Sequence, residues 1–314
     1  MAPLADNQRI GHNPARFARA PLTQGAFKSR FGENVTHFES FRSVKDVGET
    51  LRTACLHELE DAHARLTADR GNRDIAVHES RKSIRRVRAW LRLLSSNRRA
   101  ALKDADQSLR ALRRTLGPLR DAASRIAALG KLARKRDTAE LKPVLATALV
   151  DLKARKAQLW RRHPRRGLAF TRLREGLAAL IRSIPTWPLH DVDAREIRRG
   201  LKRAYRRAAQ DGEKCFGTKG AVRRHSWRGR VRIFLLQAQL FAPTNIDLER
   251  LKALVQQMGD ENDLAQVERA ISLAGLDPAA RAAVRKYTRT HRYALAKRND
   301  RRAARLLRAE TVKI

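Results

Sequence analysis

The chain has 314 residues and a formal net charge of +37, because 69 Lys and Arg face only 32 Asp and Glu. A protein this basic is expected to bind a polyanion, such as nucleic acid, inorganic polyphosphate or an acidic membrane surface. Its hydrophobic content of 42% is enough for a sizeable core, which excludes a chain that is disordered throughout.

Cysteine usage and hydropathy indicate the cellular setting. Cys55 and Cys215 are the only cysteines, so we expect neither a disulfide framework nor a Cys-based metal site. The N-terminus shows no apolar segment typical of a signal peptide. The longest apolar run, Ile233 to Phe241, is interrupted by Gln237 and Gln239, too short and too polar for a membrane span. We therefore expect a cytoplasmic protein that does not enter a membrane.

Residues 1–42 are predicted to form a poorly ordered arm, because Pro and Gly recur there without a sustained period. The arm nevertheless holds five of the nine Phe residues, Phe17, Phe27, Phe31, Phe38 and Phe41. Either the later Phe side chains dock on the rest of the protein, or the arm binds a protein partner.

Helical periodicity dominates the next part of the chain. Apolar residues at helical spacing predict helices over 44–69, 74–97, 118–136, 138–163 and 166–183, with Pro143 in the first turn of its helix. A heptad of apolar residues from Leu102 to Leu116 ends at Gly117-Pro118, which stops one helix and starts the next.

The segment Pro185 to Asp191 contains two Pro in four residues and is predicted to be a linker between two halves. Helices are then expected over 193–211, 218–241, 246–258, 260–274 and 278–308. Asp277-Pro278 supplies the N-cap and the first helical position of the last one. Because no stretch alternates like a strand, we predict an all-α fold.

One predicted helix, Val77 to Leu94, has an apolar back and a basic front. The basic side presents His78, Arg81, Lys82, Arg85, Arg88 and Arg92. Like charges three and four residues apart destabilise a helix by about 0.2–0.5 kcal/mol per pair, so the face is best explained by an anion bound on it. The alternative is a solvated basic surface.

The string His78-Glu-Ser-Arg81-Lys-Ser-Ile-Arg85-Arg86-Val-Arg88 resembles the signature of the CHAD family, the conserved histidine α-helical domain. The resemblance implies a second copy of the helix. His225, Arg228 and Arg232 repeat the spacing of zero, three and seven residues.

The two halves also align beyond these helices. Leu116-Gly-Pro-Leu-Arg120-Asp121 in the first half matches Met258-Gly-Asp-Glu-Asn-Asp263 in the second. We therefore predict an internal duplication, with two four-helix-bundle-like halves related by a pseudo-two-fold axis. The domain would cover residues 43–312, with halves at about 43–184 and 192–312.

The second copy has a shorter basic front, because Leu235 and Leu236 stand where the family usually has Arg and Tyr. A further basic stripe on the helix 193–211 is predicted to compensate in the same groove. It consists of Arg195, Arg199, Lys202 and Arg206.

Asp121 and Asp263 either orient facing Arg or His side chains or simply favour the first turn of a helix. His78 and His225 have no Cys or carboxylate at ligand spacing, so we expect no metal there. They either donate hydrogen bonds to an anion or serve the core. No motif of a nucleotide-binding loop, metalloprotease or nucleophile elbow is present, so we expect no enzyme and no cofactor.

The resemblance implies binding of inorganic polyphosphate in a basic groove and association with polyphosphate granules. The predicted binding residues are His78, Arg81, Lys82, Arg85, Arg86, Arg88, Arg92, Arg120, Arg199, Lys202, Arg203, Arg206, His225, Arg228 and Arg232. Two alternatives stay open. One is a basic helical protein that binds nucleic acid, and the other is a granule scaffold that recruits a protein through residues 1–42. If polyphosphate is the ligand, we expect nucleic acid to be a weaker competitor for the same site.

Overall fold

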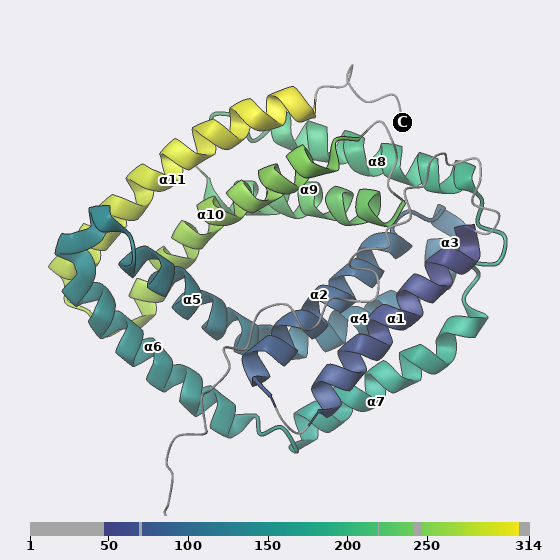
Figure 1. Ribbon diagram of the computed structural model, residues 1–314, viewed down its shortest axis with the longest axis horizontal. Coiled ribbons are helices and arrows are strands. Elements are labelled where there is room, and N and C mark those ends of the chain that lie inside the picture. The colour runs from purple at the N-terminus through teal and green to yellow at the C-terminus, as the bar shows by residue number, and fades with distance from the viewer. Residues whose placement is uncertain (1–46, 69–70, 219, 242–245, 308–314) are drawn as a thin grey trace, which may run out of the picture. The chain divides into compact units, whose positions relative to one another are not determined.

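The computed structural model describes residues 47–68, 71–218, 220–241 and 246–307, which all belong to one unit spanning residues 37–314. These residues form helices joined by short connections and contain no strand, as the sequence predicted (Figure 1). The predicted arm at 1–42 lies outside the described residues.

The first helices are α1 (Val47–Thr67), α2 (Arg73–Leu91), α3 (Ser96–Ala101), α4 (Lys103–Thr115) and α5 (Gly117–Ala133). A 3-10 helix, η1 (Arg136–Leu141), leads into α6 (Lys142–Arg162), then α7 (Leu168–Ser183) and η2 (Ile184–Thr186). The remaining helices are α8 (Ala194–Glu213), α9 (Ala221–Phe241), α10 (Leu248–Leu273) and α11 (Pro278–Leu306).

The predicted start and stop signals hold at several helix ends. Pro118 and Pro143 both lie in the first turn of their helices, where the missing N–H costs no hydrogen bond. The carboxylate of Asp277 accepts a hydrogen bond from the Ala280 N–H at 2.8 Å, which caps α11. Such a cap stabilises a helix by about 1 kcal/mol.

Three boundaries differ from the prediction. Helix α2 ends at Leu91 rather than at 97. The helices expected over 246–258 and 260–274 are a single helix, α10, which passes through Gly259 without a break. The predicted linker at 185–191 is a packed connection, because Trp187 is 5% exposed and Leu189 is fully buried.

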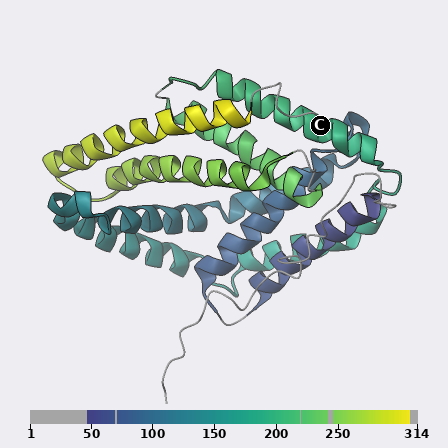
Figure 2. The same cartoon turned by 45° about the horizontal axis from the view of Figure 1, so that its top comes forward.

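Four helices contact one another in a closed order: α2 with α5, α5 with α10, α10 with α9, and α9 with α2. Each of them is paired with a further helix, namely α1 on α2, α6 on α5, α11 on α10 and α8 on α9 (Figures 1 and 2). Helix α7 packs on α1 and α4.

The core consists of two clusters, and both draw on residues before and after the predicted boundary near 185. The larger joins α1, α2, α4, α7, α8 and α9 to the first half of α10, whereas the smaller joins α5 and α6 to the second half of α10 and to α11. The described chain is therefore not divided into two separate bundles at that boundary. The internal duplication stays a prediction.

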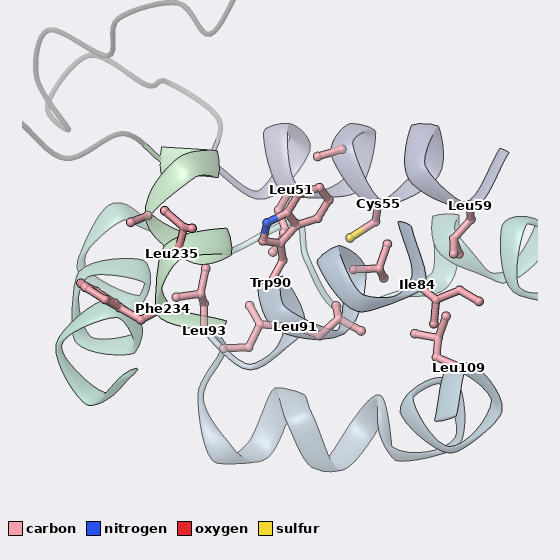
Figure 3. Packing of buried hydrophobic residues seen from close by; sticks show 14 of the residues in the cluster. Leu51, Cys55, Leu59, Ile84, Trp90, Leu91, Leu93, Leu109, Phe234 and Leu235 are labelled. Carbon is pink, nitrogen blue, oxygen red and sulfur yellow. The ribbon is translucent and has the colours of Figure 1, made fainter. Parts of the chain in front are cut away.

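Packing of α2 against α9 brings the two His-led helices together. Trp90, Leu91 and Leu93 on the α2 side meet Phe234 and Leu235 of α9 (Figure 3). Two hydrogen bonds to backbone carbonyls reinforce this contact. The indole N–H of Trp90 donates to the Leu236 carbonyl at 3.0 Å, and the Gln237 amide donates to the Ala89 carbonyl at 2.6 Å. The second half of α9 is therefore largely buried, as its apolar sequence predicted.

Candidate functional site

Six arginines from four helices form what we call the arginine cluster: Arg81 and Arg85 on α2, Arg113 on α4, Arg120 on α5, and Arg228 and Arg232 on α9. Burial lowers the pKa of every one of them. The charges lie near enough to act on one another. Five of these six arginines, all except Arg113, were predicted from the sequence to bind the ligand.

Arg85 and Arg232 have strongly lowered pKa values, with burial as the main cause and neighbouring charges as the next. Burial, followed by Arg113, Arg81, Arg228 and Arg120, lowers the pKa of Arg85 to about 10. Burial, followed by Arg85, Arg228, Arg113 and Arg120, lowers the pKa of Arg232 to about 8. A guanidinium does not readily give up its proton, so the charges persist and continue to repel one another.

Counter-charges within the protein do not resolve this repulsion. Among the described residues, no ion pair joins any arginine of the cluster to a carboxylate. The buried Nε atoms of Arg81, Arg85 and Arg228 have no hydrogen-bond partner in the described part of the chain. Unpaired buried charge is costly. The cluster therefore carries positive charge that no described carboxylate neutralises by direct contact.

Arg224, one turn before Arg228 on α9, shows how a paired arginine differs. It is 5% exposed and binds the Glu261 carboxylate in a bidentate ion pair, with Asp300 at 2.9 Å. Burial alone would lower its pKa, but Glu261 and Asp300 raise it overall. Arg224 therefore holds α9 to α10 and α11, and its charge is already neutralised.

Two glycines lie beside cluster arginines in matching positions. A Cβ added at Gly117 would lie 3.6 Å from Nη1 of Arg81, and one added at Gly259 would lie 3.2 Å from Nη2 of Arg228. In each half, the arginine three residues after the histidine meets the glycine four residues before the aspartate. The absence of a Cβ lets each guanidinium lie close to a helix backbone.

The two matched aspartates lie at the edge of the cluster. Asp121 opposes the lowering of the pKa of Arg81, and Asp263 does the same for Arg228. Lys131 binds Asp263 at 3.4 Å and Asp260 at 2.6 Å. Burial raises the pKa of Asp263 despite Lys131. Both aspartates act on the predicted arginines through their charge, and no described hydrogen bond joins them to the cluster.

The two histidines differ in their surroundings. Burial, followed by Arg120, lowers the pKa of His78 to about 4, so its imidazole is neutral at pH 7. His225 is exposed, and its Nδ1–H donates to Oδ1 of Asn262 at 2.7 Å. That bond leaves Nε2 available to accept a hydrogen bond or, when protonated, to donate one.

Two other predicted binding residues of α2, Arg86 and Arg88, have partners on neighbouring helices. Arg86 forms a bidentate ion pair with Glu58 of α1, and Arg88 forms one with Asp106 of α4 at 2.6 and 3.2 Å. Lys82 lies 2.9 Å from Glu79, and Arg92 is exposed. Arg86 and Arg88 thus tie α2 to its neighbours, and their guanidinium groups are occupied.

The basic stripe of α8 is not brought to the cluster. Arg203 donates to the carbonyls of Leu93 and Leu94 at 2.7 and 3.0 Å, which satisfies the end of α2. Arg199, Lys202 and Arg206 are exposed on the opposite side of α8 from its buried residues. No described contact links these three to the arginine cluster, so their predicted role in the same groove lacks structural support.

Arg113 is the one member of the cluster that sequence reasoning missed. It lies beside the apolar seam of α4, with Arg110 and Arg114 as neighbouring cations, and does not continue the stripe of either His-led helix. Its only signal is its place one turn before Gly117-Pro118. Because that break turns the chain toward α2, a cation there meets Arg81, whose Nη1 donates to the Arg113 carbonyl.

The described residues offer no group of three or more His, Cys, Asp or Glu side chains that could hold a metal ion. In the same part of the chain, no helix is long and apolar enough to cross a membrane.

Comparison with known proteins identifies the fold. The sequence profile of the CHAD domain matches residues 50–272, which is most of the chain. The chain belongs to the CHAD family. This CHAD domain is similar to the crystal structure of the CHAD domain from the plant Ricinus communis, with 21% identity and a TM-score of 0.56 over 85% of this chain and 93% of that one.

The CHAD domain is also similar to PptA from Streptomyces chartreusis, with 18% identity and a TM-score of 0.59 over 82% of this chain and 99% of that one. At these identities the likeness concerns the fold alone. No curated protein matches the sequence.

Proposed function

We propose that this CHAD domain binds inorganic polyphosphate at the arginine cluster. The observation that supports this most directly is the meeting of Arg85 and Arg232, from α2 and α9, without a carboxylate between them. A phosphate chain supplies one negative charge per repeating unit, and each guanidinium can donate two hydrogen bonds to a phosphate group. Membership of the CHAD family agrees with this ligand.

A linear ligand matches the arrangement of the arginines on four helices better than a single small anion does. The arginines come from four helices, and successive cations on α2 and α9 stand one turn, about 5.4 Å, apart. We infer that the phosphate chain passes between α2 and α9 in a groove and meets His78 and His225 near its edges. In the cell the protein would associate with polyphosphate granules in the cytoplasm.

The test is binding of labelled long-chain polyphosphate to the full-length protein. The variant Arg85→Gln/Arg232→Gln should weaken binding at least about tenfold, since each lost charged hydrogen bond is worth about 1.5–3 kcal/mol. The variant Arg199→Gln/Lys202→Gln is the matched control, because it removes the same charge from the exposed face of α8. Equal loss in both variants would mean that net charge, and not the cluster, holds the ligand.

Competition by duplex DNA and single-stranded RNA, at matched phosphate concentration, separates polyphosphate binding from the nucleic-acid alternative. Polyphosphate should win by about tenfold or more, a gap of about 1.4 kcal/mol. Equal competition would instead favour a general polyanion surface, whose affinity depends mainly on counterion release. Deletion of residues 1–42 should leave polyphosphate binding intact, whereas a scaffold role for the arm would show as lost recruitment of a protein.

A further inference from the structure

A cavity of about 650 Å³ lies beside the arginine cluster, between α4, α5 and α6; we call it the side cavity. Its lining includes two members of the cluster, Arg81 and Arg113, and also Leu273 at the end of α10. Ligand sites of about 300–1,000 Å³ are typical of small molecules, so the side cavity has room for one.

One part of the lining is strongly basic. Its cations are Arg81, Arg113, Arg114, Arg125, Arg155 and Lys156. Arg155 binds Asp151, and Lys156 binds Asp74 at 2.5 Å. The buried Nε of Arg125 has no partner among the described residues, and Asp121 is the only carboxylate in the lining. The basic part therefore keeps a surplus of positive charge.

The other part of the lining is apolar. Leu152 and Leu159 of α6 face the cavity together with Leu273 of α10, whose side chain stays 46% exposed. Covering such a side chain with an apolar group stabilises a complex in proportion to the area removed from water. Leu152 is already buried in the core, but an inorganic phosphate chain has no apolar group and would leave Leu273 and the partly exposed Leu159 uncovered.

A lining with both cations and leucines favours a phosphate chain that carries an organic group. We propose that the side cavity binds a nucleoside polyphosphate, with the phosphates on Arg81, Arg113 and Arg125 and the nucleoside against Leu152, Leu159 and Leu273. The planar guanidinium groups of the lining can also stack on a base. This inference deepens the proposed function, because Arg81 and Arg113 would direct the phosphates toward the arginine cluster.

The experiment compares ATP with inorganic tripolyphosphate, which has the same number of phosphates and no nucleoside, by calorimetry on the full-length protein without divalent cations. We expect ATP to bind about tenfold more tightly, although the two ligands offer similar charge. Leu273→Ser should weaken ATP binding about fivefold and change tripolyphosphate binding less than about twofold. Leu168→Ser is the matched control, since Leu168 is 64% exposed on α7 and does not line the cavity.

Arg125→Gln should weaken both ligands, whereas Arg172→Gln on the exposed face of α7 should weaken neither. If ATP binds no more tightly than tripolyphosphate, or if Leu273→Ser weakens both ligands equally, the inference is wrong. Its failure differs from that of the proposed function. Loss of long-chain polyphosphate binding in Arg85→Gln/Arg232→Gln tests the cluster, and ATP binding to that variant tests the side cavity separately.

Discussion

Replacing Arg232 by methionine should stabilise the ligand-free protein and weaken its binding of polyphosphate. Burial, together with the neighbouring arginines of the cluster, lowers the pKa of Arg232 to about 8. Because a tenfold change in proton affinity corresponds to about 1.4 kcal/mol, the site disfavours the charged side chain by about 6 kcal/mol relative to water. Entry of water and small anions takes up much of this energy, so we expect a gain of about 2 kcal/mol in the free energy of unfolding.

The measurement is urea and thermal unfolding in a buffer free of phosphate and sulfate, which would otherwise fill the site. A gain of about 2 kcal/mol corresponds to a rise of about 5 °C in Tm. Arg199→Met, on the exposed face of α8, is the control and should change little. A loss of more than about 1 kcal/mol in Arg232→Met would show that favourable contacts hold the guanidinium. That result would refute the inference that the arginines of the cluster lack counter-charges.

Three further predictions follow from other contacts. Arg224→Met should destabilise the protein by about 3–5 kcal/mol in urea unfolding, because the Glu261 carboxylate stays buried without its partner; a neutral effect would contradict this. His78 has a pKa of about 4 in the folded protein, below its usual value of about 6.5. Because the unfolded chain binds the proton more tightly, His78 makes the free energy of unfolding fall as pH drops from about 6.5 to about 4. His78→Gln should flatten that fall between pH 7 and about 4.5, and an unchanged slope would exclude His78 as its source. Gly200→Ala should lower Tm by about 5 °C, since its Cβ would lie 2.2 Å from the Leu93 carbonyl oxygen; an unchanged Tm would mean that α8 shifts freely.

Helix periodicity and capping residues predicted most of the fold, but Gly259 shows where such reasoning fails. The alignment with Gly117 suggested that both glycines end a helix. Gly117 is followed by Pro118, which cannot continue a helix, whereas Gly259 is followed by Asp260, which can. A glycine inside a helix costs about 1 kcal/mol, and the packing of α10 against α9 and α11 offsets this.

The candidate site was predicted less completely than the fold. A stripe on one helix can be recognised in a sequence, and Arg81, Arg85, Arg228 and Arg232 were found in this way. The stripe of α8 looked equally suitable, but its Arg199 faces solvent because Gly200 packs on the end of α2. Arg113 was missed for the opposite reason. Its importance depends on which helices meet, and no single helix shows that.

Because α10 is a single unbroken helix, it would fix the width of the proposed groove. This helix of 26 residues is about 39 Å long and packs on α5 and α6 as well as on α9 and α11. Any change in the spacing between α5 and α9 would have to bend α10 or uncover its buried leucines, Leu254 and Leu264 among them. A polyphosphate chain is narrow and flexible enough to enter a groove of fixed width, whereas a DNA duplex would need a groove as wide as the duplex itself. Selection by width would then act before any contact with a base, and it would need no closing movement of the protein.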